Sequence, residues 1–206
     1  MSHAEALPVV APTLTAVLFG LSGCLVDFGA RTRANSPVAT EYGEMTPGAQ
    51  AVLEELQRQQ IPCAWLDELP SPLSHTLAGS LPAWVRSSQL PATIQPWPAP
   101  DACWQALIAL NVGRLDGCVL VSGEPRLLQS GLNAGLWTVG LASCGSLCGL
   151  APAEWQALTQ QQREHKRGKA TMQLFGLGVH SVIDHLGELG TCLADINLRR
   201  LKGEKP

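Results

Sequence analysis

Short apolar runs recur along the chain and are separated by polar or amphipathic segments. Four runs, at 15–21, 61–66, 118–123 and 136–142, are apolar almost throughout, and a shorter one follows at 180–184. Continuous apolar runs of this length are typical of strands that are buried on both faces of a parallel sheet. We therefore predict a β-strand at each of these five positions.

Amphipathic helices are predicted between these strands. In the segment 46–60, Ala51, Leu53 and Leu56 share one helical face behind a Thr46-Pro47 start. Comparable patterns predict helices over 100–112 and 124–135, a weaker helix over 71–81, a helix in the tail before 180–184, and a closing helix over 189–201. This alternation indicates an α/β fold, with a doubly wound, mainly parallel, Rossmann-like sheet and helices on both faces.

The length and composition limit the number of domains and the classes of partner that we expect. With 206 residues, 46% of them hydrophobic, we expect a flexible N-terminal segment over 1–13 and a single core domain over 14–206. The 14 basic and 17 acidic residues form no broad cationic surface, so nucleic acid is not an expected partner. No apolar run reaches the ~20 residues that span a bilayer, and the first residues lack a signal-peptide pattern, so we expect no membrane association and a cytoplasmic location.

Seven cysteines lie mostly within apolar segments. An odd number in such surroundings favours buried free thiols in a reducing compartment. Cys144 and Cys148 could instead bind a metal or form a redox pair. Their spacing matches no strong zinc pattern, and no second cysteine or histidine pair accompanies them, so buried thiols are the favoured interpretation.

Four segments carry a family resemblance. They read AVLFGLSGCLVDFGARTRA at 16–34, WPAP at 97–100, GLNAGLWTVGLA at 131–142 and GVHSVIDHLGELGTCLADINLRRLKGEKP at 178–206. In their residues and in their order along the chain they resemble the haloacid dehalogenase (HAD) superfamily, most closely its phosphonoacetaldehyde hydrolase branch. The resemblance implies a HAD core sheet, a site beyond the carboxyl ends of its strands, a bound Mg²⁺ and a cap domain.

The reactive positions of that family are degenerate here. The nucleophilic aspartate of its first motif, Phe-Asp-x-x-Gly-Thr, falls on Gly20, and Ser22 is a further degenerate position of the same loop. The two acidic ligands of Mg²⁺ fall on Ser122 and Gly123. Glu124 remains as a weak candidate ligand, and one carboxylate with a hydroxyl is a poor site for this ion, so we expect no tight Mg²⁺ binding.

Four further elements of the family are missing. Trp97 stands where the family has an arginine before a Pro-x-Pro, and the hydroxyl residue after the second strand falls near Ala64 or Trp65. The segment 30–45 is too short for a helical cap, and the first lysine of the chain is Lys166, so the Schiff-base lysine of the cap has no counterpart. The resemblance therefore implies a capless HAD core without the family's catalytic groups.

The leading hypothesis is a non-catalytic HAD-fold protein that acts in binding or protein interaction, with an unknown protein partner or as a homodimer that uses the surface a cap would cover. One alternative is a residual or repurposed phosphohydrolase or phosphonohydrolase that uses Glu124, Asp27 or Cys24 on an unidentified small substrate. Another is a purely structural partner of a true phosphonatase or of another protein. Cys24 is expected to be a buried small side chain, and Asp27 to fix a turn.

Several other polar positions are open to a functional interpretation. Arg31 and Arg33 could form a weak anion site with backbone amides. The cluster 163–169 is expected to be a solvated helix face rather than a docking patch, and the scattered histidines to have surface or capping roles rather than to bind metal. Trp97 is expected at the pocket mouth, where it either fills the emptied pocket or offers an aromatic surface to a ligand or subunit.

Overall fold

A six-stranded parallel sheet forms the centre of the protein. The computed structural model describes residues 14–34, 43–87 and 94–206. The strands are β1 (Ala16–Gly20), β2 (Cys63–Leu66), β3 (Arg86–Ser87), β4 (Cys118–Ser122), β5 (Trp137–Leu141) and β6 (Ser181–Ile183). They lie in the order β3-β2-β1-β4-β5-β6, and every neighbouring pair is parallel.

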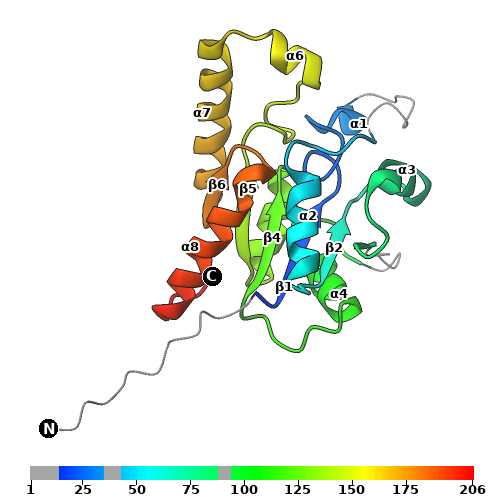
Figure 1. Ribbon diagram of the computed structural model, residues 1–206, viewed down its shortest axis with the longest axis vertical. Helices are drawn as coiled ribbons and strands as arrows, with labels where there is room; N and C mark the ends of the chain where they lie inside the picture. The colour runs from blue at the N-terminus through cyan, green and yellow to red at the C-terminus, as the bar shows by residue number, and fades with distance from the viewer. Residues whose placement is uncertain (1–13, 35–42, 88–93) are drawn as a thin grey trace, which may run out of the picture.

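The strand order reverses at a defined point of the sheet. The chain runs outward from β1 in one direction to β3, and then returns to the other side of β1 to continue through β4 to β6. The carboxyl ends of β1 and β4 therefore flank the position where the order reverses, which is where ligands bind in open α/β sheets. These ends point towards the top of Figure 1.

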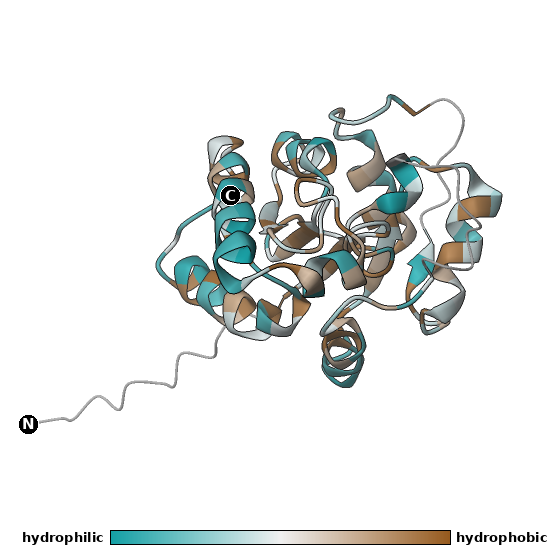
Figure 2. Ribbon diagram, turned by 90° about the horizontal axis from the view of Figure 1, so that it is seen from above, coloured by the Kyte–Doolittle hydropathy of each residue, from teal (hydrophilic) through white to brown (hydrophobic). Residues whose placement is uncertain are grey.

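Helices cover both faces of the sheet. The α-helices are α1 (Arg31–Ala34), α2 (Ala49–Arg58), α3 (Ser71–Leu77), α4 (Asp101–Ala109), α5 (Pro125–Asn133), α6 (Pro152–Ala157), α7 (Gln160–Gly176) and α8 (Leu189–Leu201), and two 3₁₀ turns, η2 (Ala78–Ser80) and η3 (Leu186–Glu188), follow α3 and precede α8. In Figure 1, α2 and α8 lie in front of the sheet, and Figure 2 shows apolar strands enclosed by helices with polar outer positions.

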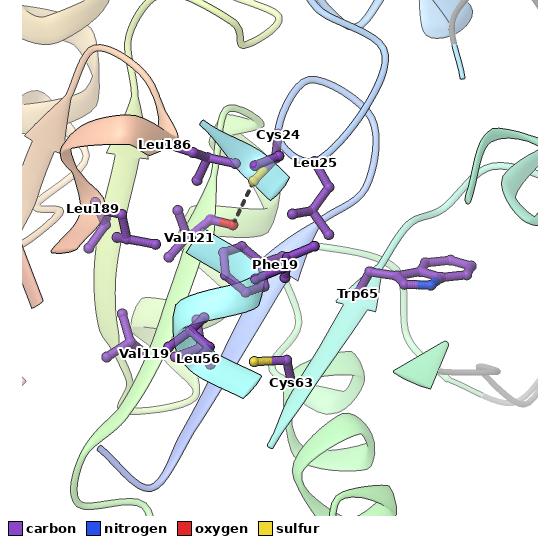
Figure 3. Packing of buried hydrophobic residues seen from close by; sticks show 14 of the residues in the cluster. Phe19, Cys24, Leu25, Leu56, Cys63, Trp65, Val119, Val121, Leu186 and Leu189 are labelled. Atoms are coloured by element: carbon purple, nitrogen blue, oxygen red, sulfur yellow. Dashed lines mark hydrogen bonds between the residues drawn. The ribbon is translucent and has the colours of Figure 1, made fainter. Parts of the chain in front are cut away.

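Two hydrophobic clusters result from the alternation of side chains along the strands. On one face, Phe19 and Val121 pack with Leu53 of α2 and Leu189 of α8; Figure 3 shows part of this cluster. On the other face, alternate strand residues pack against α4 and α5. Complete burial of each large aliphatic side chain contributes about 1.5–3 kcal/mol, so strand residues that are apolar at every position stabilise both faces at once.

The predicted fold class is confirmed, and the five predicted strands and the helix over 189–201 are present. The helix predicted over 71–81 divides into α3 and η2. Sequence analysis did not predict α1, α6 or β3, because elements of two to six residues are too short to show a period. The segment 1–13 lies outside the described residues.

No cap domain lies between β1 and α2 in the described part of the chain, where only the loop after β1, the four-residue α1 and the residues 43–48 occur. Among the described residues, no helix combines the length and apolar character needed to cross a membrane.

Candidate functional site

The position of the family nucleophile is closed by its neighbours. Gly20 is the last residue of β1, and Ser122 is the last residue of β4. A Cβ atom built on Gly20 would lie 2.7 Å from the Ser122 Oγ, 3.3 Å from its Cβ and 3.4 Å from a Leu127 methyl. The side chains of Ser122 and Leu127 therefore crowd the space that a nucleophile would need, and the Ser122 hydroxyl would have to rotate to admit one.

Three loops meet over the same strand ends. A Cβ on Gly123 would lie 2.4 Å from the Gly145 Cα and 2.4 Å from the Gly23 carbonyl oxygen. A Cβ on Gly145 would lie 2.3 Å from the Gly123 carbonyl oxygen. Since these neighbours are backbone atoms, no side chain at residue 123 fits without separation of the loops that follow β1, β4 and β5.

Ser22 and Asp27 bind each other across the loop after β1. The Ser22 hydroxyl donates to the Asp27 carboxylate at 2.6 Å, and both side chains are buried. The same carboxylate accepts the backbone N–H of Arg31 at 2.9 Å and of Thr32 at 3.1 Å. Asp27 therefore fixes the turn that leads into α1, as predicted, and its oxygens are engaged by the protein itself.

A buried ion pair lies beside this turn. Asp67, directly after β2, is bonded by the Arg33 guanidinium at 2.7 Å and by the backbone N–H groups of Ser22 and Leu69, each at 3.0 Å. The Asp67 side chain has no exposed surface, whereas that of Arg33 is 21% exposed. Burial raises the pKa of Asp67, and the Arg33 charge and these N–H donors offset only part of that effect.

Trp97 covers the other side of the pair. Its ring lies beneath the Arg33 guanidinium, 5.3 Å from the ring centre, and the residue is 2% exposed. Its backbone N–H donates to Glu68 at 2.6 Å, and its carbonyl oxygen accepts from Arg126, which also pairs with Glu68 at 3.0 Å. Trp97 is thus part of the packed interior, so its indole fills space beside the strand ends, as one of its two interpretations predicts, and it does not lie exposed at a pocket mouth.

The groups at the strand ends do not fit a Mg²⁺ site. The ion prefers an octahedral set of oxygen ligands, usually one or two free carboxylates together with several waters. The Ser122 Oγ accepts the Glu124 N–H at 3.0 Å, and the Glu124 carboxylate caps α5 by accepting from the Arg126 N–H. Within 14–34, 43–87 and 94–206, no three His, Cys, Asp or Glu side chains gather around one point where an ion could bind.

The cysteines are free thiols, and burial outweighs the nearby positive charges that would otherwise lower the pKa of Cys118, Cys148 and Cys192. Cys24 is completely buried, and its Sγ contacts the Val121 carbonyl oxygen at 3.4 Å, as Figure 3 shows. Burial raises the pKa of Cys24 and raises that of Cys144 to about 12. None of the seven forms a disulfide. Cys24 is therefore a packing side chain rather than a nucleophile.

His180, beside β6, and Arg167, in the basic cluster 163–169, are bonded to other residues of the protein. The His180 Nδ1 accepts the Thr138 backbone N–H at 3.0 Å, which requires a neutral ring, and burial and the Arg199 charge lower the His180 pKa. In the cluster 163–169, Arg167 pairs with Asp184 at 2.6 Å, whereas Arg163 is exposed.

Sequence reasoning missed the residues that occupy the site. Asp67 and Glu68 follow β2 directly, and Arg126 lies in the first turn of α5. Polar residues immediately after a buried strand were a signal for the first two, since the carboxyl ends of parallel strands share one edge of the sheet. The partners of these residues, Arg33 of α1 and Trp97 of the segment before α4, lie far away in the sequence and carried no such signal.

A cleft of about 710 Å³ lies elsewhere on this edge, between the loop before α2, the segments after β5 and β6, and the helices α6 and α7. It is lined by none of Gly20, Ser22, Trp97, Ser122 or Gly123. The residues that line this cleft are therefore distinct from those of the degenerate motif.

Comparison with known proteins agrees with this architecture. No protein-family model matches the chain. A curated relative, phosphonoacetaldehyde hydrolase of Aeromonas hydrophila, is 32% identical over 177 residues, which cover 81% of this chain and 62% of the relative. The chain therefore spans less than two thirds of the length of that enzyme.

Solved structures cover the chain more fully. One crystal structure is 61% identical and has a TM-score of 0.91, covering 94% of this chain and 100% of its own. A phosphonoacetaldehyde hydrolase-like protein from Oleispira antarctica is 22% identical, with a TM-score of 0.84 over 98% of this chain and 99% of its own. A HAD family hydrolase from Deinococcus radiodurans is 18% identical, with a TM-score of 0.61 over 90% of this chain and 97% of its own, and therefore shares the fold.

Proposed function

We propose that this chain is a non-catalytic, phosphonoacetaldehyde hydrolase-related member of the HAD superfamily that acts by binding a ligand or partner. The observation that carries the proposal is the closed state of the strand ends. There, Gly20 abuts Ser122, and three loops touch at glycines.

The interior contacts support this proposal from a second direction. Asp67 and Asp27, the buried carboxylates at this edge, are bonded by Arg33, by Ser22 and by backbone N–H groups. Carboxylates with all these donors in place stabilise the loops and are poorly suited to attack or to bind an ion. Mg²⁺ is accordingly not a proposed cofactor.

The missing groups serve different catalytic roles, so the effects of their losses on the catalytic rate add to one another. Removal of a nucleophile alone lowers the rate of an enzyme by roughly 10⁴–10⁶-fold, and the charge-stabilising and metal-binding groups contribute separately to the remainder. A chain that lacks all of them at once retains no route to the chemistry of the family.

The cellular setting follows from the cysteines. Seven free thiols, six of them buried, favour a reducing compartment, and the cytoplasm is the proposed location.

A turnover assay tests the proposal. The protein is incubated with phosphonoacetaldehyde, and separately with p-nitrophenyl phosphate, in buffer that contains Mg²⁺, and the release of phosphate is measured. The proposal predicts no release above that of a buffer blank. Phosphate release that is lost in Asp67→Asn or Glu124→Gln, while both variants stay folded, would show that the strand-end site is an active one.

A further inference from the structure

The cleft beside α6 and α7 is built from segments far apart in the chain. One wall is the loop that holds Glu44, Met45 and Pro47, and the opposite wall is formed by α6 and the first turns of α7. The base is formed by Ser143 after β5 and by Asp184 and His185 after β6. Figure 1 shows α6 and α7 standing at the carboxyl edge of the sheet.

The apolar part of the cleft is held in place by contacts between the two segments that form it. The rings of Phe28 and Trp155 pack against each other with centres 6.3 Å apart, and both residues are half-buried. Arg31 joins the same two segments, since its guanidinium donates to the Gly149 carbonyl oxygen at 2.9 Å and lies 3.8 Å from Glu154. The aromatic surface is therefore preformed and needs little ordering when a ligand binds.

The charged side chains of the cleft divide into paired and unpaired groups. Arg167 is paired with Asp184 at 2.6 Å, and Glu164 accepts from Gln160 at 2.9 Å. Arg163, one turn before Arg167 on the same face of α7, has no side-chain partner among the described residues.

Glu44, on the opposite wall, is the counterpart of Arg163. It is exposed, and within the described part of the chain its carboxylate has neither an ion pair nor a hydrogen bond. Among its described lining residues, the cleft thus offers one unpaired cation on α7 and one unpaired anion in the loop before α2, together with the aromatic side chains of Phe28 and Trp155. A ligand of matching charge has a carboxylate, an ammonium group and an apolar body.

From this arrangement we infer that the cleft binds an amphipathic zwitterion of about dipeptide size, with its carboxylate at Arg163, its ammonium group at Glu44 and its apolar side chain against Phe28 and Trp155. A volume of about 710 Å³ lies within the range of small-molecule sites and exceeds that of a single amino acid. The inference rests on the proposed function, because it names the ligand class of a protein that binds without turnover.

Isothermal titration calorimetry with L-alanyl-L-phenylalanine tests the inference. The same titration is made with the N-acetylated dipeptide, which lacks the ammonium group, and with the dipeptide amide, which lacks the carboxylate. Each blocked form is expected to bind about tenfold more weakly, since a hydrogen bond to a charged group contributes on the order of that factor. No binding of the free dipeptide at millimolar concentration, or equal binding of the blocked forms, overturns the inference.

Two substitutions locate the site. Arg163→Gln and Glu44→Gln each remove one unpaired charge and are expected to weaken binding of the dipeptide about tenfold. The matched controls are Lys169→Gln, also on α7, and Glu54→Gln, on α2, neither of which lines the cleft. If a control weakens binding as much as its matched variant, the inference is wrong.

The turnover assay with phosphonoacetaldehyde is run on the same preparation. Absence of both turnover and dipeptide binding overturns the ligand assignment and leaves the non-catalytic proposal standing. Site-dependent turnover overturns the non-catalytic proposal and, with it, the inference that rests on it.

Discussion

Restoring the missing nucleophile, by Gly20→Asp, is expected to destabilise the protein without producing activity. The new Cβ would lie 2.7 Å from the Ser122 Oγ, so the hydroxyl must rotate away from the Glu124 N–H that it now accepts at 3.0 Å. Loss of that hydrogen bond costs about 1 kcal/mol, and the tight contact of 3.3 Å with the Ser122 Cβ remains.

The carboxylate adds a larger cost. Gly20 is buried, and the Arg33 guanidinium is already bonded to Asp67. A buried, unpaired carboxyl group costs several kcal/mol or becomes protonated, and a protonated acid is a poor nucleophile. We therefore expect Gly20→Asp to lower the free energy of unfolding by about 3–5 kcal/mol.

Urea unfolding, followed by tryptophan fluorescence, measures this loss. Gly20→Ala is the matched control, because it introduces the contact without the charge, and it is expected to cost about 1 kcal/mol. The double variant Gly20→Ala/Ser122→Ala removes the clashing hydroxyl and should destabilise by less than the sum of the two single changes. A Gly20→Asp variant as stable as the parent, with Mg²⁺-dependent phosphatase activity, would refute the idea that the strand ends are closed.

Three further outcomes are expected. Burial lowers the pKa of His180 below its ordinary value of about 6.5. The contribution of the neutral ring to stability is therefore complete above about pH 6.5 and is lost as the pH falls through the lower pKa of the folded state. The urea midpoint should drop over this pH range, and it should drop less in His180→Asn. Iodoacetamide at about pH 8 should label the native protein first at the half-buried Cys192. Cys144 should be labelled only after unfolding, because burial raises its pKa to about 12. Mass spectrometry of the labelled peptides measures the order. Arg33→Met should lower the free energy of unfolding by about 2–4 kcal/mol, because it leaves the buried Asp67 carboxylate without its ion-pair partner. The double variant Arg33→Met/Asp67→Asn should recover part of that free energy, as measured by urea unfolding. A double variant that is less stable than Arg33→Met would contradict the importance of the pair.

The sheet could be predicted from the sequence because each strand buries both faces and is therefore apolar at every position. The same pattern located the ends of β1 and β4 to within one residue, since the predicted strands end at Leu21 and Gly123 and the observed strands end at Gly20 and Ser122. The strand β3 was missed, since two residues, Arg86 and Ser87, cannot show such a pattern.

The contents of the site could not be predicted in the same way. The Arg33 to Asp67 pair joins the segment after β1 to the end of β2, and only the folded arrangement shows that they meet. Trp97 was expected near a pocket mouth because of its place in a motif, whereas its contacts with Arg33 and Arg126 hold it within the interior. The cleft was missed as well, since residues as distant as Phe28 and His185 line it.

A crystal of the protein soaked in Mg²⁺ and tungstate tests the central claim most directly. The claim predicts that neither ion appears beside residue 20, with Trp97 buried and Arg33 still bonded to Asp67. A divalent ion coordinated at the ends of β1 and β4, or tungstate attached to a side chain there, would contradict it.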